Sequence, residues 1–188
     1  MKISFFGKIL ILVVVILILI IAFYFIRDII IKKIYPLKYQ SEIKIYSDEF
    51  DVDPYLVSSI IWVESKYDIE AVSNTGAIGL MQIMPDTGEW IASKIDVDDY
   101  SEPVLKDPSL NIRFGCWYLN YLNNRFGEDI VHVLAAYNGG PNRVADWLEN
   151  EEYSKANKLV NIPIKETDDY VRRVKAAYEI YTKYYTFE

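Results

Sequence analysis

Glu64 is the residue whose place in the sequence best suits proton-transfer chemistry. With Val57, Ile60 and Ile61 it keeps the spacing of one helix face, in a helix predicted over residues 54–65. That face must point into the core, which draws the Glu64 carboxyl into apolar surroundings near the end of the helix. Desolvation and the negative end of the helix dipole both raise a carboxyl pKa, and a protonated Glu can act as a general acid. The alternative is a Glu that turns out to water.

Three later segments offer groups that could contact a ligand. In "NTGAIGLMQIMPDTG", residues 74–88, glycines allow close approach of a ligand and Gln82 supplies an amide within an apolar stretch. In "AAYNGGPNRV", residues 135–144, Tyr137 and Asn138 precede two glycines, where the Asn could equally be a helix stop. In "ETDDYVRRV", residues 166–174, Tyr170 lies near the start of the last helix.

Metal and thiol chemistry have little support in the sequence. Cys116 is the single cysteine, so no intrachain disulfide can form. His132 is the single histidine and lies in the apolar run "IVHVLAAY", where a structural role is expected. No Cys, His and Asp cluster has metal-ligand spacing, and we expect neither a metal nor a cofactor.

The elements that must position these residues are predicted to be helices. Asp53-Pro54, Asp107-Pro108 and Gly140-Pro141 are helix starts, because proline suits the first helical position and Asp can cap the free amides. A short helix is expected after Pro85, one through "IVHVLAAYN", and a last one from about 166 to 182. No stretch alternates as a strand should. The fold class is all-α.

An N-terminal apolar segment precedes this domain. Residues 9–26 carry no charge, and 18 helical residues at about 1.5 Å each nearly span a hydrocarbon core of about 30 Å. A cleaved signal peptide is the competing interpretation, but the run is long for one and no small-residue cleavage site follows. We therefore expect a tail at 1–8, a transmembrane anchor at 9–26, a juxtamembrane connector at 27–44 and a catalytic domain at 45–188.

Charge divides the chain in the same way. Residues 1–40 carry a net charge of +5 and residues 41–188 a net charge of −12. An acidic folded domain argues against nucleic acid as a partner, since that needs a basic face. The basic residues Arg27, Lys32 and Lys33 outnumber Lys2 and Lys8 on the other side of the span, which alone would place the domain in the cytoplasm.

Five blocks in this domain together resemble the lytic transglycosylases of the soluble-type family 1, which have a lysozyme-like fold related to goose-type lysozyme. The blocks are Glu-Ser-x-aromatic at 64–67, Gly-x-x-Gly-Leu-Met-Gln-Ile-Met-Pro at 76–85, Asn-Ile-x-x-Gly-x-x-Tyr-Leu at 111–119, Ala-Tyr-Asn-x-Gly-Pro at 136–141 and Glu-Thr-x-x-Tyr-Val at 166–171. The departures from the family pattern are Tyr67, Gly139 and Asn142, and none involves Glu64.

The resemblance implies an activity and a site. It implies cleavage of the β-1,4 bond between N-acetylmuramic acid and N-acetylglucosamine in peptidoglycan, with Glu64 as acid and then base and a 1,6-anhydromuramoyl product. The substrate-binding residues that it implies are Ser65, Met81, Gln82, Tyr137, Asn138 and Tyr170, with Ser65 supporting Glu64 or a sugar, Tyr137 holding the acid and Met81 as a cleft wall. The anchor at 9–26 lies outside the resemblance. Because the implied substrate lies outside the cytoplasmic membrane, we expect a single-pass protein at the cell membrane with its domain extracytoplasmic, against the charge count.

Two other functions stay open from the sequence. A hydrolase of the goose-type lysozyme kind would share the fold and the Glu but would need a second carboxylate across the cleft. The residues that could supply it, outside the matched blocks, are Asp86, Asp96, Asp98 and Asp99. A non-catalytic wall-binding protein is the other possibility, and the intact set of polar residues argues against it.

Overall fold

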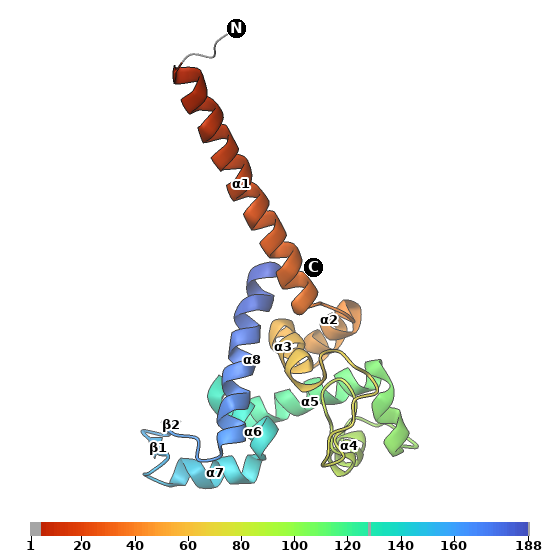
Figure 1. The fold of residues 1–188 in the computed structure, drawn as a ribbon. Helices are drawn as coiled ribbons and strands as arrows, with labels where there is room; N and C mark the ends of the chain where they lie inside the picture. The colour runs from red at the N-terminus through yellow and green to blue at the C-terminus, as the bar shows by residue number, and fades with distance from the viewer. Residues whose placement is uncertain (1–4, 128, 188) are drawn as a thin grey trace. The chain divides into compact units, whose positions relative to one another are not determined.

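The computed structural model describes residues 5–127 and 129–187 (Figure 1). The chain divides between Pro36 and Leu37 into two units, and each is described by itself.

The first unit is a single long helix, α1, from Phe5 to Ile34. Thirty helical residues extend for about 45 Å, which exceeds the thickness of a hydrocarbon core. Residues 27–34, expected to begin a connector, continue this helix. Bulky apolar side chains such as Leu12, Leu19 and Phe23 are exposed along it. The helix is long and apolar enough to cross a membrane, although a signal sequence would satisfy the same criteria.

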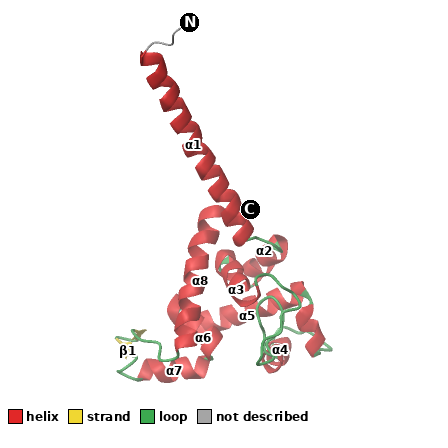
Figure 2. Ribbon diagram, viewed as in Figure 1, coloured by secondary structure: helices red, strands yellow, loops and turns green. Residues whose placement is uncertain are grey.

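The second unit is mostly helical, as predicted (Figure 2). Between α7 and α8 the chain forms a short β-hairpin that the sequence did not predict. Its two antiparallel strands have two residues each. The elements in order are α2 (Gln40–Glu49), α3 (Pro54–Ser65), α4 (Pro85–Ala92), the 3-10 helix η1 (Glu102–Lys106), α5 (Pro108–Phe126), α6 (Ile130–Gly139), α7 (Pro141–Glu149), β1 (Ser154–Lys155), β2 (Lys158–Leu159) and α8 (Lys165–Tyr184).

Aspartate caps set the first residues of three helices. The carboxylate of Asp53 accepts a hydrogen bond from the Tyr55 amide at 2.8 Å. Asp107 does the same for the Leu110 amide at 2.8 Å, and Asp129 for the Val131 amide at 3.0 Å. Each carboxylate satisfies an amide that has no partner within its helix and lies at the positive end of the helix dipole.

Helix α3 lies at the centre of the second unit. It packs against α2 and α8, while α6 packs against α5, α7 and α8. The sequence predicted one buried face, but α3 is buried on nearly every side, including Ser58 and Ser59. Their hydroxyls donate to the carbonyls of Pro54 and Tyr55 one turn earlier, which removes the cost of burying them. A helix surrounded in this way holds its C-terminal end, with Glu64, in a fixed place.

Candidate active site

The chain reverses sharply directly after Glu64. Lys66 ends α3 in the left-handed region, with φ of 54°, and its amide donates to the carbonyl of Trp62 at 3.2 Å. Tyr67 follows with φ of 65°, so two successive residues with side chains adopt a conformation that costs energy. The buried Tyr67 ring offsets this cost by packing in the core. Strain of this kind is often found beside functional residues.

Burial raises the pKa of Glu64 from 4.5 to about 7. Desolvation is the largest cause, since a charged carboxylate loses hydration in apolar surroundings. The Tyr170 hydroxyl and the charge of Arg173 oppose this shift, and the charge of Glu166 adds to it. The Glu64 side chain nevertheless keeps partial access to solvent. A partly accessible carboxyl that titrates near neutral pH can both give and take a proton.

Tyr170, from α8, lies beside Glu64. Its side chain is 1% exposed, and burial together with the Glu64 charge raises the pKa of its hydroxyl well above the usual value. The contact between the two groups is loose: it lowers the pKa of Glu64, yet it does not meet hydrogen-bond geometry. The Tyr170 hydroxyl is therefore a buried donor without a well-formed partner among the described residues.

Ser65 fastens the end of α3 to the loop that follows. Its hydroxyl donates to the carbonyls of Leu80 at 2.8 Å and Ile61 at 3.1 Å, and its side chain is buried. The sequence suggested that Ser65 supports either Glu64 or a sugar. The structure places it as a support of the loop.

Gln82 is held in the loop by its amide nitrogen. That nitrogen donates to the carbonyls of Gly79 at 2.9 Å and Ala71 at 3.1 Å, and the backbone of Gln82 has φ of 50°. Its amide oxygen accepts no hydrogen bond from the described residues. Gln82 thus presents an acceptor to a ligand, not the donor and acceptor pair that the sequence suggested.

Met81 lies beneath the site, not on its surface. The sequence predicted it as a cleft wall, but its side chain is fully buried. It packs on Gly115 of α5, where an added Cβ would come within 2.1 Å of the Met81 sulfur. Met81 contributes through its backbone: the Tyr137 hydroxyl donates to its carbonyl at 2.9 Å.

Asn111 orders the same loop, a role that the sequence did not reveal. It is fully buried, its Oδ1 accepts from the Met81 amide at 2.7 Å, and its Nδ2 donates to the carbonyls of Leu105 at 2.8 Å and Ile78 at 3.0 Å. The Asn111 side chain lies against Gly79. A Cβ added at position 79 would come within 2.5 Å of the Asn111 Nδ2. The only sequence signal was its place in the third matched block.

Tyr137 and Asn138 bring the end of α6 to this loop and to α8. The charge of Glu64 contributes to raising the pKa of Tyr137, which places the two side chains close together. Asn138 is exposed, and its Oδ1 accepts a hydrogen bond from the Thr167 hydroxyl at 2.9 Å. This bond leaves the Asn138 amide hydrogens directed to solvent. Glu64, Tyr137 and Tyr170 therefore lie close together. Gln82 is the residue after Met81, which Tyr137 binds, and Asn138 follows Tyr137 and is bonded to Thr167 of α8.

The two cations of this region are Arg173 of α8 and Lys66, the residue that ends α3. Arg173 acts on both Glu64 and Lys66, and neither cation forms an ion pair with a described carboxylate. Burial, and then the charge of Arg173, lower the pKa of Lys66 to about 8. Glu166 is the one described carboxylate that acts on Glu64. None of the four aspartates considered for a second catalytic carboxylate does so.

The remaining reactive side chains lie outside the site. His132 is buried, and its Nε2 accepts a hydrogen bond from the Leu159 amide at 3.1 Å, which links α6 to β2. Cys116 is buried, which raises the pKa of its thiol. Among residues 5–127 and 129–187, no group of His, Cys, Asp or Glu is arranged to hold a metal ion.

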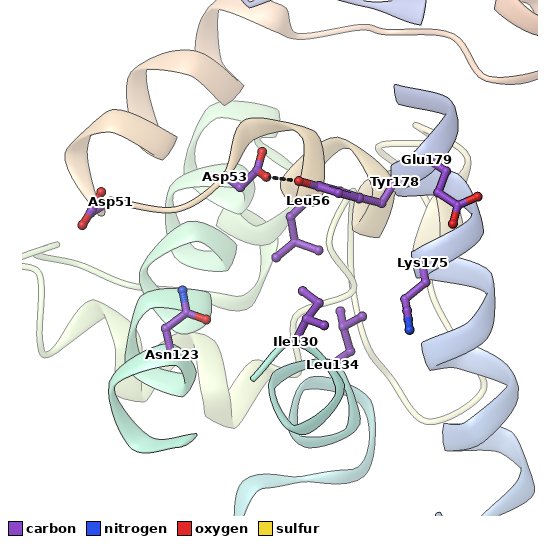
Figure 3. A pocket seen from close by; sticks show the side chains of 9 residues that line it. All are labelled: Asp51, Asp53, Leu56, Asn123, Ile130, Leu134, Lys175, Tyr178 and Glu179. Atoms are coloured by element: carbon purple, nitrogen blue, oxygen red, sulfur yellow. Dashed lines mark hydrogen bonds between the residues drawn. The ribbon is translucent and has the colours of Figure 1, made fainter. Parts of the chain in front are cut away.

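A separate pocket of about 500 Å³ lies at the far ends of the same helices (Figure 3). Leu56, Ile130 and Leu134 line it with apolar groups, and Asp53 accepts a hydrogen bond from the Tyr178 hydroxyl at 2.6 Å beside them. The distance along α3 from Asp53 to Glu64 is about 16 Å, from the helical rise. This pocket contains none of the predicted site residues.

The fold agrees with comparisons to known proteins. Residues 41–160 match the Transglycosylase SLT domain, and the chain belongs to that family. The soluble lytic murein transglycosylase of Escherichia coli (strain K12) is 36% identical over 154 residues, which cover 80% of this chain and 24% of that protein. The membrane-bound lytic murein transglycosylase C of Shigella sonnei (strain Ss046) is 33% identical over 129 residues, covering 64% of this chain and 36% of that protein.

A solved structure gives the same result for the fold. The lytic transglycosylase Slt from Pseudomonas aeruginosa, solved as an inactive Glu-to-Gln variant, matches with a TM-score of 0.71 and 29% sequence identity. The match covers 79% of this chain and 24% of that one. This chain therefore spans about a quarter of the length of these soluble relatives.

Proposed function

We propose that this protein is a peptidoglycan lytic transglycosylase in which Glu64 is the single catalytic carboxyl. The observation that carries the proposal is the burial of the Glu64 carboxyl at the end of α3, beside Tyr137 of α6 and Tyr170 of α8, which raises its pKa to about 7. Most glycosidases use two carboxylates, whereas the only described carboxylate acting on Glu64 is Glu166, which belongs to the first turn of α8. A lone acid suits a reaction in which the substrate supplies the remaining groups.

The first step is cleavage of the glycosidic bond. Protonated Glu64 donates its proton to the oxygen between the muramoyl and glucosaminyl residues as the bond to C1 breaks. The acetamido carbonyl of the muramoyl residue stabilises the positive charge that develops at C1, as in other substrate-assisted glycosidases. Because burial raises the pKa of Glu64 to about 7, a large share of the molecules carry the proton at neutral pH and have it available for this step.

The second step closes a ring in the same sugar. Glu64, now a carboxylate, removes the proton from the C6 hydroxyl, and that oxygen attacks C1. The product is a 1,6-anhydromuramoyl end, Glu64 regains its proton, and no water is consumed. Attack from within the substrate gains from proximity, so the site needs no positioned nucleophilic water.

The other site residues have assigned roles in this proposal. The Gln82 amide oxygen and the Asn138 amide hydrogens bind polar groups of the glycan. The Tyr170 hydroxyl, buried and without a well-formed partner, tightens onto Glu64 when the carboxylate forms. The Tyr137 hydroxyl is already engaged with Met81, so Tyr137 shapes the site through its ring and does not hold the acid.

The location follows from the substrate and from α1. We propose that α1 anchors the protein to the cell membrane in a single pass, with the domain on the outer side where peptidoglycan lies. The apolar length of α1 and the existence of a similar membrane-bound transglycosylase support this. Protease added to intact spheroplasts should degrade the domain, and protection of the domain would refute the topology.

Analysis of the products separates transglycosylase from hydrolase. Muropeptides released by the full chain should end in anhydromuramic acid, one water lighter than a hydrolysed end, and should carry no oxygen-18 from labelled water. Incorporation of the label would instead show a goose-type hydrolase. The Glu64→Gln variant should bind glycan without cleaving it, and unchanged turnover would remove Glu64 from the mechanism. A wild-type chain that binds but never cleaves would be a wall-binding protein.

A further inference from the structure

A cluster of aromatic side chains adjoins the site through Tyr137. It consists of Trp90 from α4, Trp117, Tyr118 and Tyr121 from α5, and Tyr137 from α6. The Tyr137 and Tyr118 ring centres are 5.5 Å apart, and those of Tyr118 and Tyr121 are 6.0 Å apart. The cluster therefore begins at a ring that lies close to Glu64 and continues outward.

The rings on α5 are nearly parallel. Trp117 and Tyr121 stack with an angle of 5° between their planes, and Tyr118 and Tyr121 with an angle of 14°. Trp90 meets Trp117 and Tyr121 edge-on, with centres 5.0 Å from each. Edge-to-face contacts of this kind fix the rings in place before any ligand arrives.

These rings do not belong to the core face of their helix. Ile112, Cys116 and Leu119 keep a helical spacing on α5 and are fully buried. Trp117 and Tyr121, four residues apart, occupy another face and are partly exposed. Partly exposed aromatic side chains next to a few polar groups are the kind of lining that ligand sites have.

We propose that Trp90, Trp117 and Tyr121 form an aromatic platform that binds N-acetylhexosamine residues of the glycan strand beyond the pair at the scissile bond. A pyranose ring has a face of C–H groups that packs on the negative face of an aromatic ring. This inference rests on the proposed function and adds to it a direction for the strand, from Glu64 along the exposed face of α5 toward α4. In Figure 1, α4 and α8 lie on opposite sides of α3, which fits a strand leaving Glu64 away from α8.

Glycan binding by an inactive chain tests the platform. The full-length Glu64→Gln parent, in a detergent without a sugar headgroup, is titrated calorimetrically with chitohexaose and with chitobiose. The parent should bind the hexamer more tightly than the dimer. Adding Trp117→Ala should weaken hexamer binding at least tenfold, while Trp117→Phe, which keeps a ring, should recover most of it. Tyr153→Ala is the control, since Tyr153 is half-exposed and makes no ring contact with the cluster.

A second measurement, fluorine NMR, observes the tryptophans of the parent chain with all of its aromatic rings in place. The four tryptophans of the Glu64→Gln parent are labelled with 5-fluorotryptophan, and their fluorine signals are assigned with single Trp→Phe variants. Chitohexaose should shift the signals of Trp90 and Trp117 and leave that of the buried Trp147 unchanged.

The outcomes separate this inference from the proposed function. Any of three results would overturn the platform. The first is equal hexamer affinity in the parent and in the Trp117→Ala variant, and the second is unshifted fluorine signals of Trp90 and Trp117. The third is a parent chain that does not bind the hexamer. If the wild-type chain still releases anhydro-muropeptides in those cases, the proposed function stands. If the wild-type chain cleaves nothing, the proposed function fails, whatever the platform binds.

Discussion

The hydroxyl of Tyr137 donates a 2.9 Å hydrogen bond to the backbone carbonyl of Met81, joining the last turn of α6 to the loop that carries Gln82. Ser65 makes the corresponding bond from α3 to the neighbouring carbonyl of Leu80 at 2.8 Å. The loop is thus attached at adjacent residues to two helices. Both helices carry site residues at these ends, so the bonds fix the position of Gln82 relative to Glu64.

Replacing Tyr137 with Phe should loosen this junction. The Met81 carbonyl would lose its partner while staying buried, which costs about 1–3 kcal/mol of the free energy of unfolding. We expect a lower unfolding midpoint and a lower kcat for peptidoglycan cleavage. Thermal unfolding followed by tryptophan fluorescence measures the first effect. Tyr153→Phe is a control without a comparable hydroxyl bond, and equal midpoints for the two variants would contradict the role of the Tyr137 hydroxyl.

Glu64 should make stability depend on pH. Its pKa is about 7 in the folded protein and close to 4.5 when unfolded, so the folded state binds the proton more tightly. The stability associated with the bound proton is fully present below about pH 4.5 and is lost as the pH rises through about 7. A shift of this size corresponds to at most about 3 kcal/mol, less what the partial exposure of Glu64 removes.

Glu64→Gln should therefore be more stable than the wild type at pH 8 and equally stable at pH 4. Chemical unfolding of both full-length chains at the two pH values provides the comparison. A stability difference that is the same at pH 4 and pH 8 would show that the Glu64 carboxyl is not desolvated in the folded protein.

Arg173 should set the alkaline limit of activity. Its positive charge lowers the pKa of Glu64, so Arg173→Gln should raise that pKa and move the alkaline limb of kcat/KM to higher pH. Arg172→Gln is the matched control, because Arg172 is paired with Asp168 and Asp169 and is not among the groups acting on Glu64. Equal limbs in the two variants, or a shift to lower pH in Arg173→Gln, would argue against Glu64 as the acid.

Much of the fold could be predicted because its start signals are local. Asp53 and Asp107 cap helices that begin at the following proline, and both α3 and α5 have the expected bounds. Helix α2 was missed, since the residue before its first turn, Tyr39, is left-handed with φ of 53° and offers no side-chain cap. The hairpin of β1 and β2 is too short to show a strand pattern.

The site could be predicted less fully, because its geometry depends on contacts between distant segments. The spacing around Glu64 indicated a desolvated carboxyl, and the structure shows one. Nothing local showed that Met81 would be buried, since the space for it is left by Gly115 on another helix. The role of Asn111 was equally hidden, as its partners are backbone groups brought to it by folding.

The fit between Gly115 and Met81 leads to a last prediction. Gly115→Ala should destabilise the protein by about 1–3 kcal/mol, because the new methyl would overlap the Met81 side chain in a packed interior, although alanine favours a helix. Met81→Ala should cost about 2–5 kcal/mol through the cavity it leaves. In the double variant the methyl at 115 enters that cavity, so its cost should be smaller than the two single costs added together. Chemical unfolding of the four chains gives the coupling free energy, which should be at least about 0.5 kcal/mol in this direction. Additive costs would mean that the two residues do not compete for the same space beneath the loop.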